Sequence, residues 1–375
     1  MASSKYGRIY FMSEFKYHFQ PREGWMNDPN GLCRYNGEYH AFFQFNPYST
    51  QWDRMHWGHA VSKDLISWRQ LSPALVPDTH YENTGGCFSG SSIEKDGKLY
   101  LFYTGVSAEY LQSQCGAVSS DGLRFEKFRF NPIIKHDAKL DNGNFRDPKV
   151  GKLGDVYYMV CGSEKDKTGR ILLFTSRDLV SWKFENVIYE TDEFGGCLEC
   201  PDLFPLDGKW ILMFSAMRPT KAKTVFVTGD FDGVNFKAEN RVYSEYGSDF
   251  YAPQTFDDNG ARVMIGWLNH FGRPLPPGKT AAGAFSIPRE LTLRDGRVYN
   301  FPVKSARGLL TETCGCVRVD GTVIAVEEGG VSFARFDFKD VNGIKSIDDI
   351  KILRDGALVE IFVNGGLASF TVWLA

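Results

Sequence analysis

The segment Gly97-Lys98-Leu99-Tyr100-Leu101-Phe102-Tyr103 joins a glycine turn to a short strand of bulky, mostly apolar side chains. Four more segments repeat this pattern, and they begin at Gly37, Gly154, Gly208 and Gly260. The spacings between the five glycines are 60, 57, 54 and 52 residues. A unit of this length, made of short strands and polar turns, corresponds to one four-stranded propeller blade. The repeat therefore predicts an all-β chain with a five-bladed β-propeller over residues 15–302.

A second feature recurs in each unit, where a turn Asp is followed four residues later by an aromatic side chain. The five pairs are Asp64 and Trp68, Asp121 and Phe125, Asp178 and Trp182, Asp232 and Phe236, and Asp295 and Tyr299. In the fifth unit this Asp lies 35 residues after the blade glycine rather than 24 to 27, which predicts an insertion around residues 273–278. No stretch sustains the 3.6-residue apolar period of an amphipathic helix.

The pattern changes after residue 302. Short alternating strands are expected over residues 317–319, 322–326, 332–338 and 359–363. They predict a small antiparallel, sandwich-like module over residues 303–375, packed on the propeller.

Composition narrows the class of protein. The net charge of −3 on 375 residues provides no basic field for nucleic acid or an anionic membrane. No apolar run has the length of a membrane span. The first 15 residues lack the apolar stretch of a secretory signal, so we expect a cytoplasmic protein or one from which a leader has been removed. The eight cysteines lack the spacing of a disulfide framework, which favours free thiols in a reducing cytosol.

Three of the repeats carry an acid next to a proline at the same position. Seven to nine residues before the blade glycines stand Asp28, Phe88, Asp147, Glu199 and Tyr251. Because the innermost strand of each blade lines the propeller axis, equivalent positions on five blades face one funnel. We therefore expect three carboxylates, one Phe and one Tyr to surround a single pocket. A lone Asp-Pro pair would more simply start a loop, but three in phase favour the pocket.

Paired carboxylates in one pocket are the working groups of sugar-bond hydrolysis. That reaction needs one carboxylate that stays ionised and one carboxylic acid that donates a proton near neutral pH. Asp28 lies among amide side chains that can hydrogen-bond an anion, whereas Glu199 lies in a less polar stretch. Arg146 is expected to keep the adjacent Asp147 ionised and to help it bind sugar hydroxyls. This context favours Asp28 as nucleophile, Glu199 as acid/base and Asp147 as sugar binder.

Around these residues the chain resembles glycoside hydrolase family 32, the invertase and β-fructofuranosidase family. The resemblance runs almost continuously over residues 18–302. It rests on Trp25-Met26-Asn27-Asp28-Pro29-Asn30-Gly31, Gln44-Phe45-Asn46-Pro47, Phe88-Ser89-Gly90-Ser91, Phe145-Arg146-Asp147-Pro148, Glu199-Cys200-Pro201-Asp202 and Asp249-Phe250-Tyr251-Ala252-Pro253. It implies a five-bladed propeller and a retaining double displacement on the fructosyl unit of sucrose, sucrose 6-phosphate or short fructo-oligosaccharides.

By that resemblance Asp28 attacks the anomeric carbon, and Glu199 protonates the leaving oxygen and then activates water. Asp147 and Arg146 would hold fructose hydroxyls. The rest of the pocket would comprise Asn27, Gln44, Trp52, Phe88, Ser89, Cys200 and Tyr251, with Trp267 as a candidate sugar platform. The mechanism requires no metal or organic cofactor, and a small sugar is the expected partner. Family members usually carry a larger C-terminal β-sandwich than residues 303–375 could form.

Three other functions stay open. A fructosyltransferase would use the same residues and replace water by a sugar hydroxyl. A non-catalytic sugar-binding propeller is disfavoured by the intact Asp28 and Glu199. An inverting propeller enzyme acting on arabinan-like chains would need more widely spaced carboxyls. The sequence leaves undetermined both phosphate recognition, for which Arg22, Arg54 and Arg273 are candidates, and the oligomeric state, a homodimer included.

Overall fold

The structure is a computed structural model that describes residues 15–218, 222–268, 275, 278–341 and 344–374. The described part consists of strands, turns and four short 3₁₀ segments, η1 (His80–Glu82), η2 (Lys304–Leu309), η3 (Phe338–Asp340) and η4 (Asn364–Gly366). This confirms the all-β prediction. Within these ranges no helix combines the length and the hydropathy that crossing a membrane requires.

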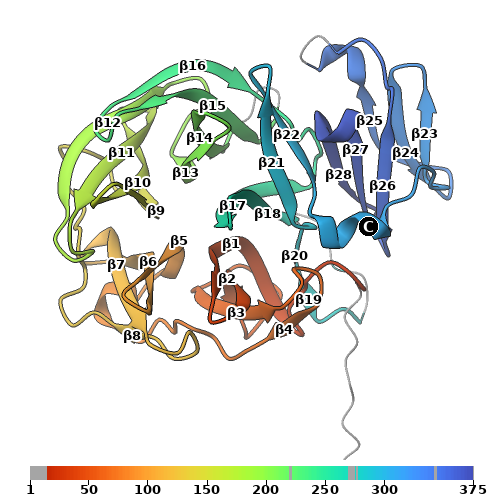
Figure 1. Ribbon diagram of the computed structural model, residues 1–375. Coiled ribbons are helices and arrows are strands. Elements are labelled where there is room, and N and C mark those ends of the chain that lie inside the picture. The colour runs from red at the N-terminus through yellow and green to blue at the C-terminus, as the bar shows by residue number, and fades with distance from the viewer. Residues whose placement is uncertain (1–14, 219–221, 269–274, 276–277, 342–343, 375) are drawn as a thin grey trace, which may run out of the picture.

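Five sheets of four or five strands surround a common centre (Figure 1). The first, in the order β19-β1-β2-β3-β4, contains β1 (Gly24–Tyr35), β2 (Glu38–Asn46), β3 (His56–Ser62), β4 (Trp68–Gln70) and β19 (Ala281–Ala282). The second contains β5 (Gly86–Lys95), β6 (Lys98–Ser107), β7 (Leu111–Ser119) and β8 (Glu126–Lys127). The third contains β9 (Phe145–Leu153), β10 (Val156–Lys165), β11 (Thr168–Ser176) and β12 (Lys183–Thr191).

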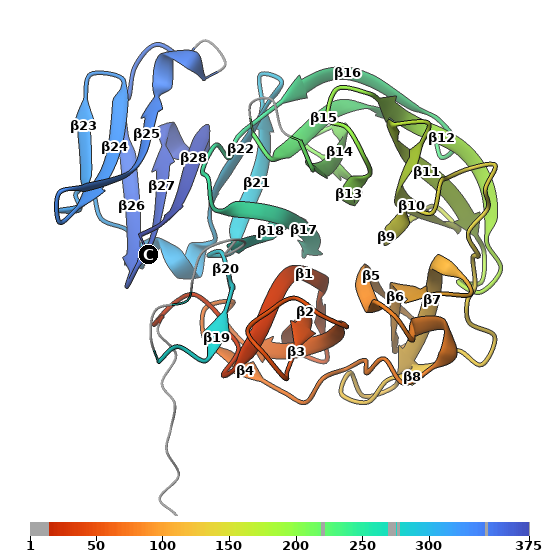
Figure 2. The same ribbon diagram turned by 180° about the vertical axis from the view of Figure 1, so that it is seen from behind.

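The fourth sheet contains β13 (Leu198–Leu206), β14 (Lys209–Ala216), β15 (Thr224–Phe231) and β16 (Phe236–Val242). The fifth contains β17 (Phe250–Asp258), β18 (Ala261–Leu268), β20 (Ala284–Phe285), β21 (Arg289–Arg294) and β22 (Arg297–Pro302). The strands nearest the centre are β1, β5, β9, β13 and β17, and both views show them as a ring (Figures 1 and 2). Each of these inner strands contacts the next, and β17 contacts β1, so the ring is closed.

The repeated glycines occupy the tight turn between the first two strands of each sheet. At the β5–β6 hairpin Lys95 pairs with Lys98, so Asp96 and Gly97 form a two-residue turn with φ values of 53° and 71°. Both values lie in the left-handed region, which glycine adopts without strain and Asp tolerates. The backbone of this hairpin therefore explains the glycine of the repeat.

The turn aspartates join the third and fourth strands of the sheets. In the first four sheets the Oδ1 of this Asp accepts the backbone N–H groups two and three residues further on, at Asp64, Asp121, Asp178 and Asp232. In the fifth, Asp295 and Gly296 instead form a two-residue hairpin between β21 and β22. The predicted insertion falls between β18 and β21, and its residues 273–274 and 276–277 lie outside the described residues.

Two three-stranded sheets follow, and both views show them beside β21 and β22 (Figures 1 and 2). They contain β23 (Val317–Asp320), β24 (Val323–Glu328) and β25 (Val331–Asp337), and β26 (Ile350–Asp355), β27 (Leu358–Val363) and β28 (Ala368–Trp373). Both contribute to one apolar core, which includes Ile324, Val326, Ile352, Ile361 and Phe370.

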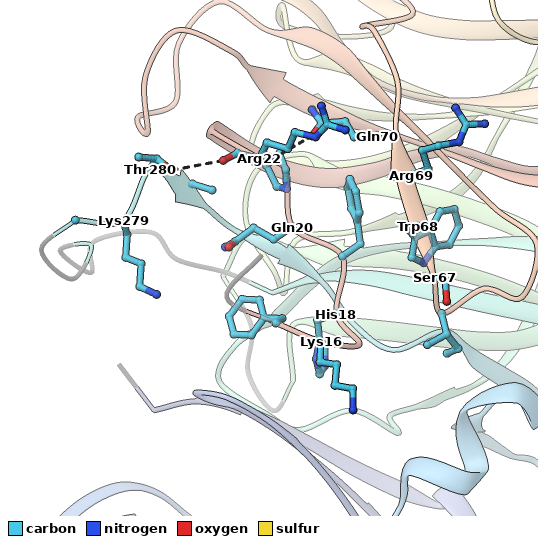
Figure 3. A pocket seen from close by; sticks show the side chains of 16 residues that line it. Lys16, His18, Gln20, Arg22, Ser67, Trp68, Arg69, Gln70, Lys279 and Thr280 are labelled. Atoms are coloured by element: carbon cyan, nitrogen blue, oxygen red, sulfur yellow. Dashed lines mark hydrogen bonds between the residues drawn. The ribbon is translucent and has the colours of Figure 1, made fainter. Parts of the chain in front are cut away.

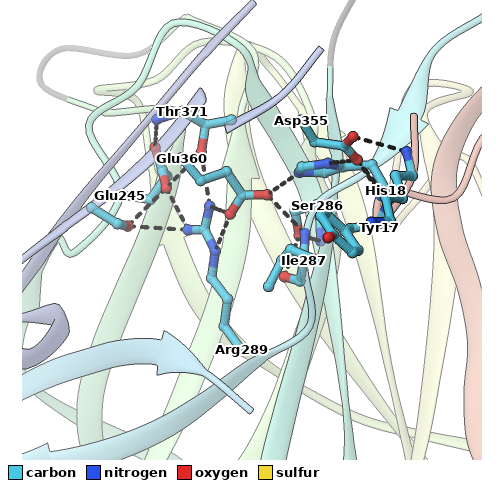
Figure 4. A network of polar contacts seen from close by, with 12 residues as sticks. Tyr17, His18, Glu245, Ser286, Ile287, Arg289, Asp355, Glu360 and Thr371 are labelled. Atoms are coloured by element: carbon cyan, nitrogen blue, oxygen red, sulfur yellow. Dashed lines mark hydrogen bonds and ion pairs between the residues drawn. The ribbon is translucent and has the colours of Figure 1, made fainter. Parts of the chain in front are cut away.

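A buried polar network attaches β26, β27 and β28 to the ring of sheets (Figure 4). The two ring nitrogens of His18 lie 3.0 Å from Asp355 Oδ2 and 2.9 Å from Glu360 Oε1. Arg289 Nη2 lies 2.6 Å from Glu360 Oε2, and its Nη1 lies 2.5 Å from Glu245 Oε2. Removing one partner of such a buried pair costs about 3–5 kcal/mol, because the other charge is left uncompensated. The network therefore fixes these strands to the N-terminal segment and to β21.

Candidate active site

Each of the five inner strands is interrupted by a β-bulge at the residues expected in the site. Regular pairing breaks between Met26 and Pro29, Phe88 and Gly90, Arg146 and Lys149, Glu199 and Asp202, and Tyr251 and Gln254. Three bulges contain a residue with positive φ directly before a proline, namely Asp147 at 62°, Cys200 at 47° and Ala252 at 47°. A bulge re-aims side chains, and proline has no N–H to contribute to a ladder. These three residues, each followed by a proline, thus mark where the inner strands turn side chains toward the centre.

The redirected side chains line one cavity of about 330 Å³. The lining contains all three predicted carboxylates, and in full it comprises Asn27, Asp28, Gln44, Trp52, Phe88, Ser89, Gln112, Asn144, Arg146, Asp147, Glu199, Tyr251 and Trp267. Of the residues predicted for the pocket, Cys200 is missing from this lining. Its Sγ lies 3.5 Å from Asp28 Oδ2 and its N–H donates to Asp147, so it contacts the carboxylates without facing the cavity.

Besides the thiol of Cys200, two side chains donate hydrogen bonds to Asp28. Asn27 Nδ2 donates to its Oδ1 at 3.0 Å, and Ser89 Oγ donates to its Oδ2 at 2.7 Å. Trp25 Nε1 in turn donates to Asn27 Oδ1 at 2.8 Å and fixes the amide. Burial raises the pKa of Asp28, while both hydrogen bonds oppose that rise. The donors therefore favour the ionised carboxylate.

Asp147 occupies the bulge of β9 and is buried. Its Oδ2 accepts the N–H of Cys200 at 2.8 Å and lies 3.9 Å from Arg146 Nε. Burial raises the pKa of Asp147 to about 7, although the charge of Arg146 lowers it. The charge of Arg146 thus favours the ionised carboxylate as expected, but burial and the nearby charges of Glu199 and Asp28 outweigh its effect on this pKa.

Glu199 receives two strong donors from other strands. Arg146 Nη2 donates to its Oε1 at 2.8 Å, and the hydroxyl of Tyr251 donates to its Oε2. These surroundings are more polar than the flanking sequence indicated, because the donors come from β9 and β17 rather than from β13. Among the described lining residues Arg146 is the one cation, so three carboxylates share it.

Two lining residues that sequence reasoning missed hold Arg146 in place. Gln112 Oε1 accepts Arg146 Nη1 at 3.3 Å and the N–H of Phe145 at 2.9 Å. Asn144 Oδ1 accepts the same Nη1 at 3.0 Å. Gln112 belongs to β7, for which the repeat gave no signal. Asn144 stands two residues before Arg146, and its position beside the Arg146-Asp147 motif could have identified it as a residue of the site.

Three buried residues connect the inner strands β9, β13 and β17 just beyond the active-site residues. Lys149 Nζ lies 3.0 Å from Asp202 Oδ2 and donates to the carbonyl of Thr255 at 2.5 Å. The N–H and Oγ1 of Thr255 donate to the same Asp202 oxygen at 2.8 and 2.9 Å. We call Lys149, Asp202 and Thr255 the axial clasp. They follow Asp147, Glu199 and Tyr251 by two, three and four residues, so the clasp couples the three strands that carry those groups.

A second cavity, of about 560 Å³, lies between the N-terminal segment, β4 and residues 278–281 (Figure 3). Its described lining includes His18 and the cations Lys16, Arg22, Arg69 and Lys279 but no carboxylate, so it lacks the pair of carboxyl groups that the other cavity offers. Arg22, a phosphate candidate, thus lies away from the acids. Arg54 donates to the carbonyl of Pro77, and Arg273 lies outside the described residues. Within the described ranges no group of three or more His, Cys, Asp or Glu side chains could hold a metal ion.

Comparison with known proteins places these features in a family context. Residues 18–302 match the model of the glycosyl hydrolases family 32 N-terminal domain. The chain is 38% identical to raffinose invertase and 36% identical to sucrose-6-phosphate hydrolase, both from Escherichia coli, in alignments that cover 78% of this chain and 65% of each relative. The chain thus spans less than two thirds of the length of these relatives. The solved β-fructofuranosidase of Bombyx mori superimposes with a TM-score of 0.83 at 30% identity, covering 96% of this chain and 88% of that one.

Proposed function

The chain belongs to glycoside hydrolase family 32, and from this premise we propose that it is a retaining β-fructofuranosidase. Its substrates are sucrose, sucrose 6-phosphate or short fructo-oligosaccharides, and it hydrolyses their fructosyl linkage. The names of the E. coli relatives support this substrate class. We further propose that the five sheets over residues 15–302 are the blades of a five-bladed propeller, followed by a small β module over residues 303–375.

One observation carries the proposal. Asp28 from β1 and Glu199 from β13 line the same cavity, with Asp147 and Arg146 beside them. The two acids are 171 residues apart in sequence, and only the closed ring of inner strands brings them together. Two carboxyl groups on one sugar-sized cavity are the minimum that glycosidic bond cleavage requires.

The two acids act in turn. The carboxylate of Asp28 attacks the anomeric carbon of the fructosyl unit and forms an ester, while Glu199 gives a proton to the leaving oxygen. Glu199 then takes a proton from water, which attacks the same carbon and releases Asp28. Ser89 and Asn27 stabilise the Asp28 anion before and after this cycle. Asp147 and Arg146 bind the fructosyl hydroxyls, and the negative charge of the carboxylates opposes the positive charge of the oxocarbenium-like state.

The proton comes from the carboxylate cluster. Since burial raises the pKa of Asp147 to about 7, the three neighbouring carboxyls retain a proton near neutral pH. Interacting carboxyls titrate together, so this proton belongs to the cluster rather than to one residue.

Sugar release from sucrose tests the proposal. The full chain should release glucose and fructose in equal amounts, and Asp28→Asn or Glu199→Gln should lower turnover by about 10³-fold or more with unchanged circular dichroism. Glu126→Gln, an exposed acid on β8, is the matched control and should keep wild-type turnover.

Each departure has a distinct meaning. Glucose in excess of fructose would identify a fructosyltransferase. Sucrose binding without any release would identify a sugar-binding protein. Wild-type turnover in either active-site variant would overturn the assigned roles.

A further inference from the structure

Two thiols touch each other in the turn that precedes β23. The Sγ atoms of Cys314 and Cys316 lie 3.0 Å apart, and only Gly315 separates the two residues. All eight cysteines of the chain are free thiols, and this is the one sulfur–sulfur contact among the described residues. From this contact we propose that Cys314 and Cys316 form a reversible dithiol–disulfide site, which small-molecule disulfides oxidise.

The two sulfurs differ in their access to solvent. Cys314 is half-buried, whereas Cys316 is 3% exposed and packs into the core shared by the last two sheets. The N–H of Val317 donates to the carbonyl of Cys314 at 3.0 Å, and the N–H of Glu327 donates to the carbonyl of Cys316 at 2.8 Å. These bonds close a tight turn that keeps both sulfurs on one side. The Cys314 thiol is therefore accessible to a reagent, and the Cys316 thiol is held in contact with the Cys314 sulfur.

The glycine between them leaves the turn free to adjust. A Cβ at Gly315 would meet no atom within 4 Å, so this side of the turn is open. Disulfide formation needs the sulfurs to approach to about 2.05 Å with a defined torsion. An open turn with a glycine can make that adjustment without displacing the core.

A metal site is the weaker assignment. Structural zinc takes four ligands, commonly cysteine and histidine, whereas the two thiols supply only half of that number. No third His, Cys, Asp or Glu completes a set with them in the described part of the chain.

The chemistry balances without any further reactant. The Cys314 thiolate attacks one sulfur of the small-molecule disulfide, forms a mixed disulfide and expels the first thiolate. Cys316 then loses its proton to solvent and attacks the Cys314 sulfur, which expels the second thiolate. Two protein thiols are oxidised by two electrons, and one disulfide is reduced to two thiols.

The order of attack follows from the surroundings. Burial, and then the hydrogen bond with Cys314, raises the pKa of the Cys316 thiol to about 11. The accessible Cys314 is therefore the attacking thiol, and Cys316 resolves the mixed disulfide. Because the closed loop is so short, the disulfide adds little chain-entropy stabilisation and is easily reduced. The pair is thus a reversible site rather than a structural staple.

Peptide mass measurement tests this proposal on the full chain. The reduced protein is incubated with oxidised glutathione, alkylated and cleaved with trypsin, which releases residues 308–318 with both cysteines and no other. We expect this peptide to escape alkylation and to weigh less than the dithiol form by two hydrogen atoms. Dithiothreitol added to the native protein should restore the dithiol.

Single variants separate the two roles. Cys316→Ser should leave Cys314 carrying one glutathione, and Cys314→Ser should leave Cys316 alkylated only after denaturation. Cys33→Ser, at a partly exposed cysteine of β1, should form the same internal disulfide as the unchanged protein. Recovery of peptide 308–318 with two alkyl groups or two glutathiones, or a disulfide that dithiothreitol cannot reduce in the native protein, would overturn the proposal.

Discussion

Lys149→Met in the axial clasp is the most informative change to the support of the site. It removes the cation 3.0 Å from Asp202 Oδ2 and the bond to the carbonyl of Thr255. Asp202 is 0% exposed and its Oδ1 already has no hydrogen-bond partner, so the remaining carboxylate charge has only the two donors of Thr255. Leaving a buried charge unpaired costs about 3–5 kcal/mol. We expect the free energy of unfolding to fall by that amount.

The same change should slow the reaction. The clasp couples β9, β13 and β17, and misplacing reacting groups by about 1 Å can cost roughly 10²-fold in rate. Urea unfolding measures the stability, and sucrose hydrolysis measures kcat and KM. Lys152→Met, an exposed lysine on the same strand, is the matched control.

A double variant keeps this test meaningful if the single variant unfolds. Lys149→Met with Asp202→Leu removes both charges and fills the space with apolar atoms, which in buried pairs is often neutral for stability. We expect its stability to return to within about 1 kcal/mol of the unchanged protein. A cost below about 1 kcal/mol for Lys149→Met alone, with unchanged kcat, would show that the axial clasp neither stabilises the ring of sheets nor positions the site.

Three further predictions concern pH and positioning. Burial lowers the pKa of His18, but Asp355 and Glu360 outweigh burial and raise this pKa above its ordinary 6.5. The contribution of His18 to the free energy of unfolding is therefore complete below pH 6.5 and is lost as pH rises through the pKa of the folded protein. The pKa values of those two acids are lowered to about 2, so their stabilisation holds above their ordinary values of 3.8 and 4.5 and is lost as pH falls toward 2. The urea concentration at the unfolding midpoint should therefore be highest between about pH 5 and 6.5. His18→Gln should abolish the fall of this midpoint above pH 6.5, and a fall that persists in the variant would contradict the role of His18 in the network. Ser89→Ala removes a bond to the Asp28 anion worth about 1.5–3 kcal/mol, so the acid limb of kcat/KM should move up by about 1–2 pH units, and an unmoved limb would disprove that bond's role. Gln112→Ala leaves Arg146 Nη1 with Asn144 alone and should lower kcat/KM by about 10-fold; wild-type kcat/KM in this variant would show that Gln112 does not position the guanidinium.

The repeat made the ring of sheets predictable because the turns depend on local chemistry. A two-residue hairpin such as Asp96-Gly97 requires positive φ, and a turn such as that of Asp64 requires a carboxylate at a fixed offset. Both requirements restrict the residue type at a turn, so the turns can be recognised in the sequence without any knowledge of the fold. The pairing of Asp28 with Glu199 was predictable for the same reason, since phase alone places them on inner strands.

Electrostatics could not be read in the same way. The pKa of Asp147 depends on how deeply the bulge buries it, and the surroundings of Glu199 depend on Arg146 and Tyr251 from two other strands. Gln112 contacts Arg146 from β7, the third strand of its sheet, and no sequence pattern predicts this contact. Such contacts between distant segments appear only once the sheets are assembled.

The stereochemistry of methanolysis tests whether Asp28 and Glu199 act from opposite sides of one fructosyl linkage. Sucrose is hydrolysed in water containing methanol, and the methyl fructofuranoside, which cannot change its anomeric form after release, is identified by NMR. Attack by Asp28 followed by a second displacement gives the methyl β-fructofuranoside, and Asp28→Asn should give none. The methyl α-fructofuranoside as the product, or the β form from Asp28→Asn at an undiminished rate, would contradict the double displacement.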